Sequence, residues 1–288
     1  MDNPPIEKRF FFHANAVGFA ARMLTPNNYF IPAVASSCLP VTGGEGRTTE
    51  TNLKFGNVLS CDSASTNVRG VFIDEEDGGS TEKRSGNVHF RPTSTISESR
   101  IKGLRIVNGP RVLEIGSLEA TMVALTNDDG KPEFRSLSAK FESVRVDGVA
   151  LTIETHTNVL EEFSTKERLS EAYARDPAFR ERYGHCFFGI KPTNPKEHKI
   201  PEMDGLIYGT VVTGLKWGGE GPFDAVIKGN SVTITNFGAI YLGEIVIEED
   251  FRRLTLLRFQ LGSDTSGSGS AAEVQANGST WPPKKDGG

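Results

Sequence analysis

Apolar and polar residues alternate with a period of two along most of this chain, which is the pattern of β-strands whose two faces meet different surroundings. Residues 9–19 place Phe10, Phe12 and Ala14 on one face, and a further aromatic residue, Phe11, on the other. Aromatic residues on both faces are typical of a strand inside a sandwich or barrel. The pattern therefore predicts that the ordered part of the chain begins with a strand.

The alternation is clearest in the middle of the chain, over 116–125 and 134–153. It slips by one residue between Phe141 and Val144, which predicts a β-bulge because an extra residue re-aims the strand face. Further strands are predicted at 53–73, 205–217, 223–247 and 251–261. The three prolines Pro26, Pro32 and Pro40 predict a loop that continues to Gly46.

One segment has helical signals. Ser164 and Glu167 have the spacing of a capping box, in which the Ser164 hydroxyl accepts the Glu167 amide, and this predicts a helix to about Arg175. Asp176 followed by Pro177 predicts a cap and the start of a second short helix, which Gly184 ends. We expect a two-helix insertion at about 158–184.

The two ends of the chain carry weak signals. Residues 1–8 are predicted to be an N-terminal extension, and 262–288 a flexible, disordered tail, because Ser, Gly and Pro offer little apolar surface to offset ordering entropy. The predicted fold is one mainly β domain over 9–261, an antiparallel sandwich or barrel-like domain with the small helical insertion.

Composition and charge limit the classes of partner and the cellular compartments that we expect. The net charge is -5 with both signs interspersed, which suits a soluble protein and argues against a nucleic-acid partner. No stretch approaches the roughly 18 apolar residues of a membrane span. Polar residues interrupt the N-terminal apolar stretch, so we expect a cytoplasmic protein, or one exported without a cleavable signal peptide. Three cysteines (Cys38, Cys61 and Cys186) are predicted to be free thiols.

The sequence contains none of the familiar local catalytic motifs. The sequence has no nucleophile elbow and no phosphate-binding loop, and its five histidines lack metal-ligand spacing. The acidic run 74–77 is predicted to be a solvent-facing loop rather than a calcium site. We therefore predict no catalytic residue, no metal and no cofactor, and we lean against an enzyme.

Two functional hypotheses stay open. The first is a non-catalytic binding or self-assembling protein whose sheet edges and loops contact a protein partner or a second copy. The alternative is a β-barrel that binds an apolar small molecule and acts as an isomerase or cyclase by confinement. Its candidate ligand-binding residues are His13, Tyr29, His89, His185 and Tyr208.

The runs 99–109, 138–148 and 235–244 share a rhythm of strand followed by turn. In this they resemble β-rich bacterial surface proteins of the uncharacterised "choice-of-anchor" kind. The resemblance implies a bacterial, extracellular and non-enzymatic protein, and it transfers no functional residue. The helical insertion and the absence of a leader and anchor depart from that pattern.

Overall fold

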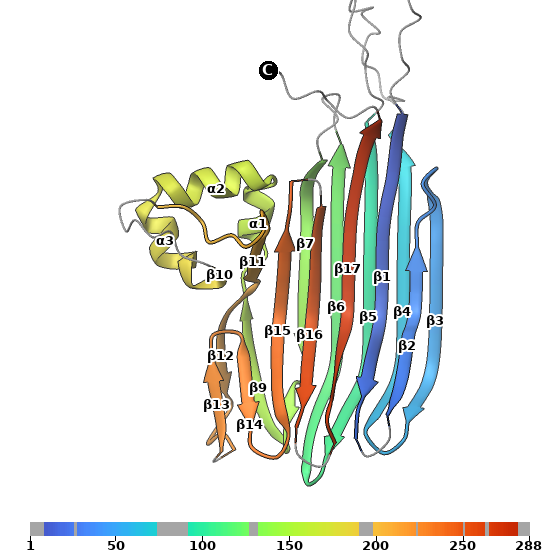
Figure 1. Cartoon of the computed structure of the whole chain (residues 1–288), viewed down its shortest axis with the longest axis vertical. Helices are drawn as coiled ribbons and strands as arrows, with labels where there is room; N and C mark the ends of the chain where they lie inside the picture. Colours follow the sequence, from blue (N-terminus) through green and yellow to red (C-terminus); the bar gives the residue numbers. More distant parts are fainter. Residues whose placement is uncertain are drawn as a thin grey trace, which may run out of the picture.

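The chain folds into two antiparallel sheets that face each other, with short helices at one side (Figure 1). The structure is a computed structural model that describes residues 9–25, 28–73, 92–126, 132–189, 198–222, 224–249, 251–262 and 265–281. Within these residues no strand pairing joins one sheet to the other. The mainly β prediction is confirmed, and of its two forms the sandwich is the correct one.

The first sheet contains both ends of the ordered chain. Its order is β10 (Phe187–Phe188), β11 (Ile207–Thr210), β15 (Gly238–Ile247), β16 (Phe251–Leu261), β17 (Gly267–Trp281), β1 (Arg9–Met23) and β2 (Tyr29–Cys38). The hairpin of β13 (Ala225–Lys228) and β14 (Ser231–Ile234) pairs with β15. The first and last long strands, β1 and β17, are therefore neighbours, and β1 lies next to the edge strand β2.

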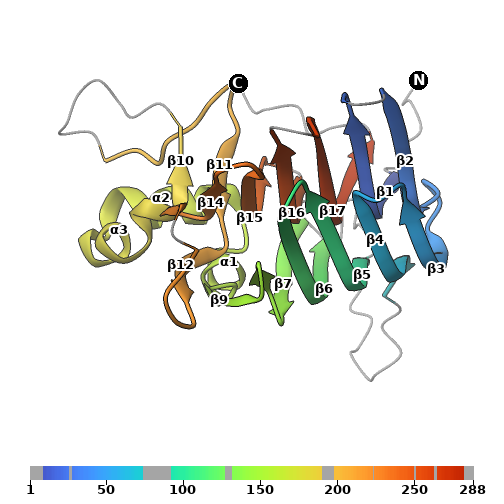
Figure 2. The same cartoon turned by 90° about the horizontal axis from the view of Figure 1, so that it is seen from below.

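The second sheet is a meander of consecutive strands. Its order is β12 (Val212–Trp217), β9 (Val149–Thr155), β8 (Arg145–Val146), β6 (Arg111–Thr126), β5 (Thr93–Asn108), β4 (Leu59–Phe72) and β3 (Gly44–Phe55). β7 (Pro132–Glu142) pairs with β6 beside β8. Seen from below, the two sheets form two facing rows of strands (Figure 2).

The proline-rich segment was predicted to be a loop, and this was wrong. Residues 29–38 form β2, and β3 already begins at Gly44. β2 is an edge strand, where Pro32 is tolerated because a proline that faces solvent removes no ladder hydrogen bond.

The prediction of a disordered tail was also wrong for most of its length. Residues 267–281 form β17, which pairs with β1 on one side and β16 on the other. A ladder on both sides satisfies the backbone of this Gly-, Ser- and Ala-rich strand, and its small side chains suit a narrow interior. Residues 282–288 and 1–8 lie outside the described part of the chain.

The insertion contains three α-helices instead of the predicted two. They are α1 (Asn158–Glu162), α2 (Lys166–Arg175) and α3 (Pro177–Tyr183), and a 3-10 turn (Gly184–Cys186) follows them. The cap of α2 is Thr165, whose hydroxyl accepts the Arg168 amide, so the predicted Ser164 cap was wrong by one residue. Asp176 caps α3 as predicted, and its carboxylate accepts the Ala178 and Phe179 amides.

One half of the sandwich, formed by β1 and β17 over β4 and β5, is thin. Ser97 Oγ of β5 donates to Asn15 O of β1 at 2.7 Å, and Ser99 Oγ donates to Val17 O at 2.9 Å. A serine side chain and one hydrogen bond thus span a gap that is usually about 10 Å between facing sheets. Between the larger side chains Phe12 and Phe19 of β1, many of the buried side chains here are small: Ala14, Ala16, Ala64, Ala120, Ala272 and Ala276.

The other half carries the helices and buries a cation. Arg252 of β16 is 1% exposed, and its guanidinium donates to Leu160 O at 2.8 Å and to Phe163 O at 2.7 Å. It also lies 4.6 Å from the centre of the Phe134 ring. These carbonyls belong to the end of α1, where helical partners are lacking, so Arg252 fastens the insertion to the first sheet.

A single transverse row, which we call the seam, crosses each sheet. Along β5 the buried positions are odd up to Ile101 and even from Leu104, and the other long strands of both sheets switch similarly. In alternate strands a seam residue has positive φ: Ala35, Gly243 and Ala272 in the first sheet, and Asn52, Gly103 and Ser143 in the second. Register is kept across the seam because neighbouring strands carry the extra residue together.

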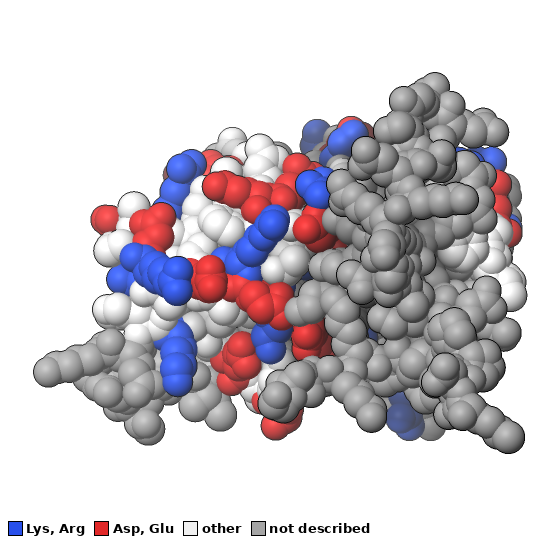
Figure 3. Space-filling view, turned by 90° about the horizontal axis from the view of Figure 1, so that it is seen from above, with Lys and Arg blue, Asp and Glu red and all other residues white. Residues whose placement is uncertain are grey.

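Acidic and basic side chains are interspersed over the end of the molecule that carries the helices (Figure 3). None of the helices that the structure describes is both long and apolar enough to cross a membrane.

Candidate functional site

The second sheet carries two adjoining features of functional interest, the free edge of β3 and a polar hollow on the outer face of β3–β6. The facing edge strand of the first sheet, β2, has its free backbone groups hydrogen-bonded by side chains of β3. Ala35 N donates to Glu50 Oε1 at 3.0 Å, and Thr48 Oγ1 donates to Ser36 O at 3.0 Å. These bonds occupy backbone groups that β2 would otherwise present to another strand.

The edge of β3 has no such cover among the described strands. β3 pairs with β4 alone, and over 45–51 its outward side chains are Glu45, Arg47, Thr49 and Thr51, all exposed. This segment ends at the seam residue Asn52, where φ is +55°. A further strand can therefore pair along 45–51 without crossing the seam.

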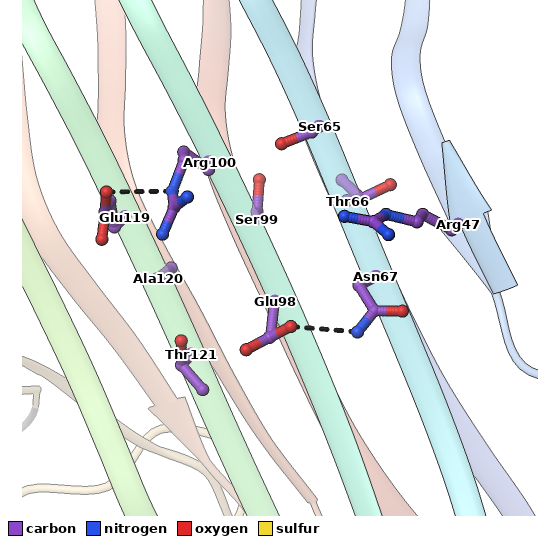
Figure 4. Close-up of a pocket in the computed structure, with 10 residues that line it drawn as sticks. All are labelled: Arg47, Ser65, Thr66, Asn67, Glu98, Ser99, Arg100, Glu119, Ala120 and Thr121. Carbon is purple, nitrogen blue, oxygen red and sulfur yellow. Dashed lines mark hydrogen bonds and ion pairs between the residues drawn. The ribbon is translucent and has the colours of Figure 1, made fainter. Parts of the chain in front are cut away.

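The polar hollow is built by strand register. Arg47 of β3 lies opposite Asn67 of β4, Asn67 opposite Glu98 of β5, and Glu98 opposite Thr121 of β6. With Ser65, Arg100 and Glu119 from the next row, these side chains surround a hollow of about 130 Å³ (Figure 4). The register thus collects charged and hydroxyl groups from four strands at one place.

Some polar side chains around this hollow have hydrogen-bond or ion-pair partners, and others have none among the described residues. Asn67 Nδ2 donates to Glu98 Oε2 at 3.0 Å, and Arg100 Nε lies 2.9 Å from Glu119 Oε1 (Figure 4). Asn67 Oδ1 is buried without a partner. The Arg47 guanidinium makes no hydrogen bond or ion pair with the described residues. A cation and a carboxylate are thus available to a ligand, whereas the buried amide oxygen is not.

The cysteines are unpaired, as predicted. Burial raises the pKa of both the Cys61 and the Cys186 thiol to about 11. Both thiols are therefore protonated near neutral pH, whereas a nucleophile must be a thiolate. Cys38 is exposed on β2.

Within the described residues, no three His, Cys, Asp or Glu side chains group in a way that could hold a metal ion.

The residues predicted to bind an apolar ligand do not meet in one cavity. His13 is exposed on β1 and Tyr29 is half-buried at the start of β2, whereas Tyr208 lies on β11, with β15, β16 and β17 between. His185 is exposed in the 3-10 turn, next to the β10–β11 pair that holds Tyr208. His89 lies outside the described residues.

The space between the sheets is filled by side chains. Phe12, Phe19, Phe237 and Phe259 are each at most 1% exposed. An apolar hollow beside the helices, where Tyr183 Oη contacts His156 Nε2, measures about 20 Å³ and has room for a single water molecule. The filled interior removes the main support for confinement of an apolar ligand.

Sequence reasoning missed the hollow entirely. Arg47, Asn67, Glu98 and Arg100 occur at alternate positions of separate strands, and nothing local distinguishes them from solvated residues. The available signal was the run of polar residues at every second position of 45–51, 63–69 and 98–102. It becomes a site only when the register is known.

The comparisons with known proteins give a family without a function. No curated protein and no solved structure matches the chain. The family match ends before β16 and β17, which complete the middle of the first sheet. Residues 10–248, most of the chain, match the model of the family described as Domain of unknown function (DUF8256), and the chain therefore belongs to that family.

Proposed function

We propose that this chain is a non-catalytic binding protein that assembles with a second copy of itself through the edge of β3. The observation that supports this most directly is the uncovered edge over 45–51, beside a β2 edge that side chains close. An exposed strand edge is a template for pairing with another chain. The raised thiol pKa values of Cys61 and Cys186 agree with a role without catalysis.

The length of the free segment 45–51 and the charges of β3 together favour one pairing. Two copies of β3 related by a two-fold axis pair antiparallel, and their opposed residues share a face. With the axis through Thr48, all of 45–51 pairs, Arg47 faces Thr49 of the second copy, and Glu45 faces Thr51. No like charges meet in this arrangement. Moving the axis by one residue, to Arg47, would oppose two guanidinium groups, which is unfavourable.

This pairing is tested by replacing each of the two exposed threonines, Thr49 and Thr51, with a positively or a negatively charged residue. Thr49→Arg places a guanidinium opposite Arg47 at two symmetric positions, and Thr49→Glu places a carboxylate there. Each opposed pair contributes roughly 0.2–1 kcal/mol. We therefore expect Thr49→Arg to weaken dimerisation by up to about thirtyfold and Thr49→Glu to strengthen it by a similar factor, measured by sedimentation equilibrium.

Thr51 provides a control of opposite sign. It faces Glu45, so Thr51→Arg should strengthen the dimer and Thr51→Glu should weaken it. Both positions are exposed, and the thermal stability of the isolated subunit should hardly change. A chain that stays monomeric at high concentration, or four variants with equal dissociation constants, would refute the proposal.

A further inference from the structure

We propose that the hollow on the outer face of β3–β6 binds a small zwitterion, a molecule with an ammonium and a carboxylate group on neighbouring carbon atoms, such as a free α-amino acid. This site is separate from the proposed dimer edge and does not depend on it. The argument rests on three features of the hollow, which are its separated opposite charges, its hydroxyl groups and its size.

The opposite charges are held apart across one strand. Arg47 and Glu98 both lie opposite Asn67 in the register, one from each neighbouring strand, so their Cα atoms are two strand spacings, about 10 Å, apart. The Asn67 amide binds Glu98 Oε2 and holds this carboxylate on the far side from Arg47. Neither charge has an oppositely charged partner among the described residues, and Figure 4 shows both beside the same hollow.

The signs around the hollow disfavour ions of one charge. An anion at Arg47 would also approach the carboxylates of Glu98 and Glu119, and a cation at Glu98 would approach Arg47 and Arg100. A zwitterion places its carboxylate at Arg47 and its ammonium at Glu98, so that it gains two attractions where a singly charged ion gains one. At an exposed site each attraction is worth about a factor of five in affinity.

The remaining polar groups suit the same ligand. The Asn67 amide turns its Nδ2 donor toward Glu98 and so helps to fix the carboxylate that an ammonium would meet. The Ser65 and Thr121 hydroxyl groups line the hollow as additional donors and acceptors. A volume of about 130 Å³ has room for several water molecules, enough for a small α-amino acid.

The test compares a zwitterion with its two charged halves by NMR titration of the isotope-labelled full chain. L-serine is the zwitterion, ethanolamine lacks its carboxylate, and 3-hydroxypropionate lacks its ammonium. We expect L-serine to shift amide signals of β3–β6 saturably, with a dissociation constant on the order of 1 mM. Each half should bind about fivefold more weakly or less.

Two variants that each remove one charge assign the charges. Glu98→Gln should abolish the preference for L-serine over 3-hydroxypropionate, and Arg47→Gln should abolish its preference over ethanolamine. Lys102→Gln, on the same exposed face of β5 but outside the hollow, should change neither. The proposal is wrong if L-serine causes no saturable shift, if either half binds as tightly, or if Lys102→Gln has the same effect as the other two variants.

Discussion

The two halves of this sandwich hold their sheets together by different means. In the thin half, alanines and two serine hydroxyls bridge β5 and β1 directly. In the helical half, large side chains fill the gap, and the buried Arg252 connects β16 to the carbonyls at the end of α1. The stability of the thin half therefore depends on side chains small enough for the sheets to approach closely. The stability of the helical half depends on hydrogen bonds to its buried polar groups.

This difference predicts how each half fails. A well-packed interior of small residues cannot accept an added methyl group without moving backbone, because no flexible side chain is present to yield. A buried guanidinium tolerates a change of shape better than the loss of its hydrogen bonds, because the orphaned carbonyls cannot reach water.

The largest effect is expected at Arg252. Arg252→Ala removes the donors to Leu160 O and Phe163 O and leaves a cavity, so we expect a loss of about 3–4 kcal/mol in the free energy of unfolding. Arg252→Met fills the space without the donors and should lose less. Chemical denaturation measures both. Equal losses for the two variants would show that the lost hydrogen bonds, and not the volume, matter at this position.

The charge of Arg252 gives the same position a pH dependence. Burial lowers the pKa of Arg252 to about 9, below its value of ~12.5 in the unfolded chain. Below pH 9 the guanidinium is charged in both states and carries its desolvation cost. Above pH 9 the folded state releases the proton first, so stability rises with pH. Relative to Arg252→Met, the natural chain should gain up to about 1.4 kcal/mol per pH unit between pH 9 and 11.

A smaller but clear loss is expected in the thin half at Gly18. A Cβ atom there would lie 2.8 Å from Val34 O and 2.9 Å from Ala64 Cβ. Gly18→Val should therefore cost about 2–3 kcal/mol in the free energy of unfolding through overpacking. The control is Gly219→Val, because a Cβ atom there meets nothing within 4 Å. Similar denaturation midpoints for the two variants would contradict the account of a thin, volume-limited half.

The smallest effect is expected on the rates of cysteine labelling, which report the opening of each half separately. In the natural chain at pH 8, a thiol reagent should label exposed Cys38 quickly and buried Cys61 and Cys186 slowly. Arg252→Ala should speed labelling of Cys186, beside the helices, by about tenfold through local opening, and leave Cys61 of β4 unchanged. Peptide mass spectrometry follows each site. Parallel acceleration of both cysteines would mean that the halves open as one unit.

Sequence reasoning succeeded where a local pattern determines the structure. Alternation identified the long strands, and Asp176 with Pro177 identified the start of α3. It failed where distant segments decide the outcome. β17 looks disordered until β1 and β16 supply ladders on both sides, and β2 looks like a loop because its prolines are acceptable only at a sheet edge.

The same limit applies to the candidate site. Arg47, Asn67 and Glu98 are separated by long stretches of chain and meet only through the register of β3, β4 and β5. A shift of one residue in either pairing would turn one set of side chains to the other face. The sequence specifies this register through the whole sheet and not through any local motif.

The seam has a consequence for the uniqueness of that register. In an ordinary sheet, a strand that slips by two residues keeps its apolar face inward, so even-numbered slips are a common route to mispairing. Here each strand changes phase at a fixed row, and Gly103 admits Asp62 so closely that a Cβ atom would lie 2.1 Å from Asp62 Oδ2. A slipped strand would change phase out of step with its neighbours. Because of the seam, only one register places the phase change of every strand in the same row.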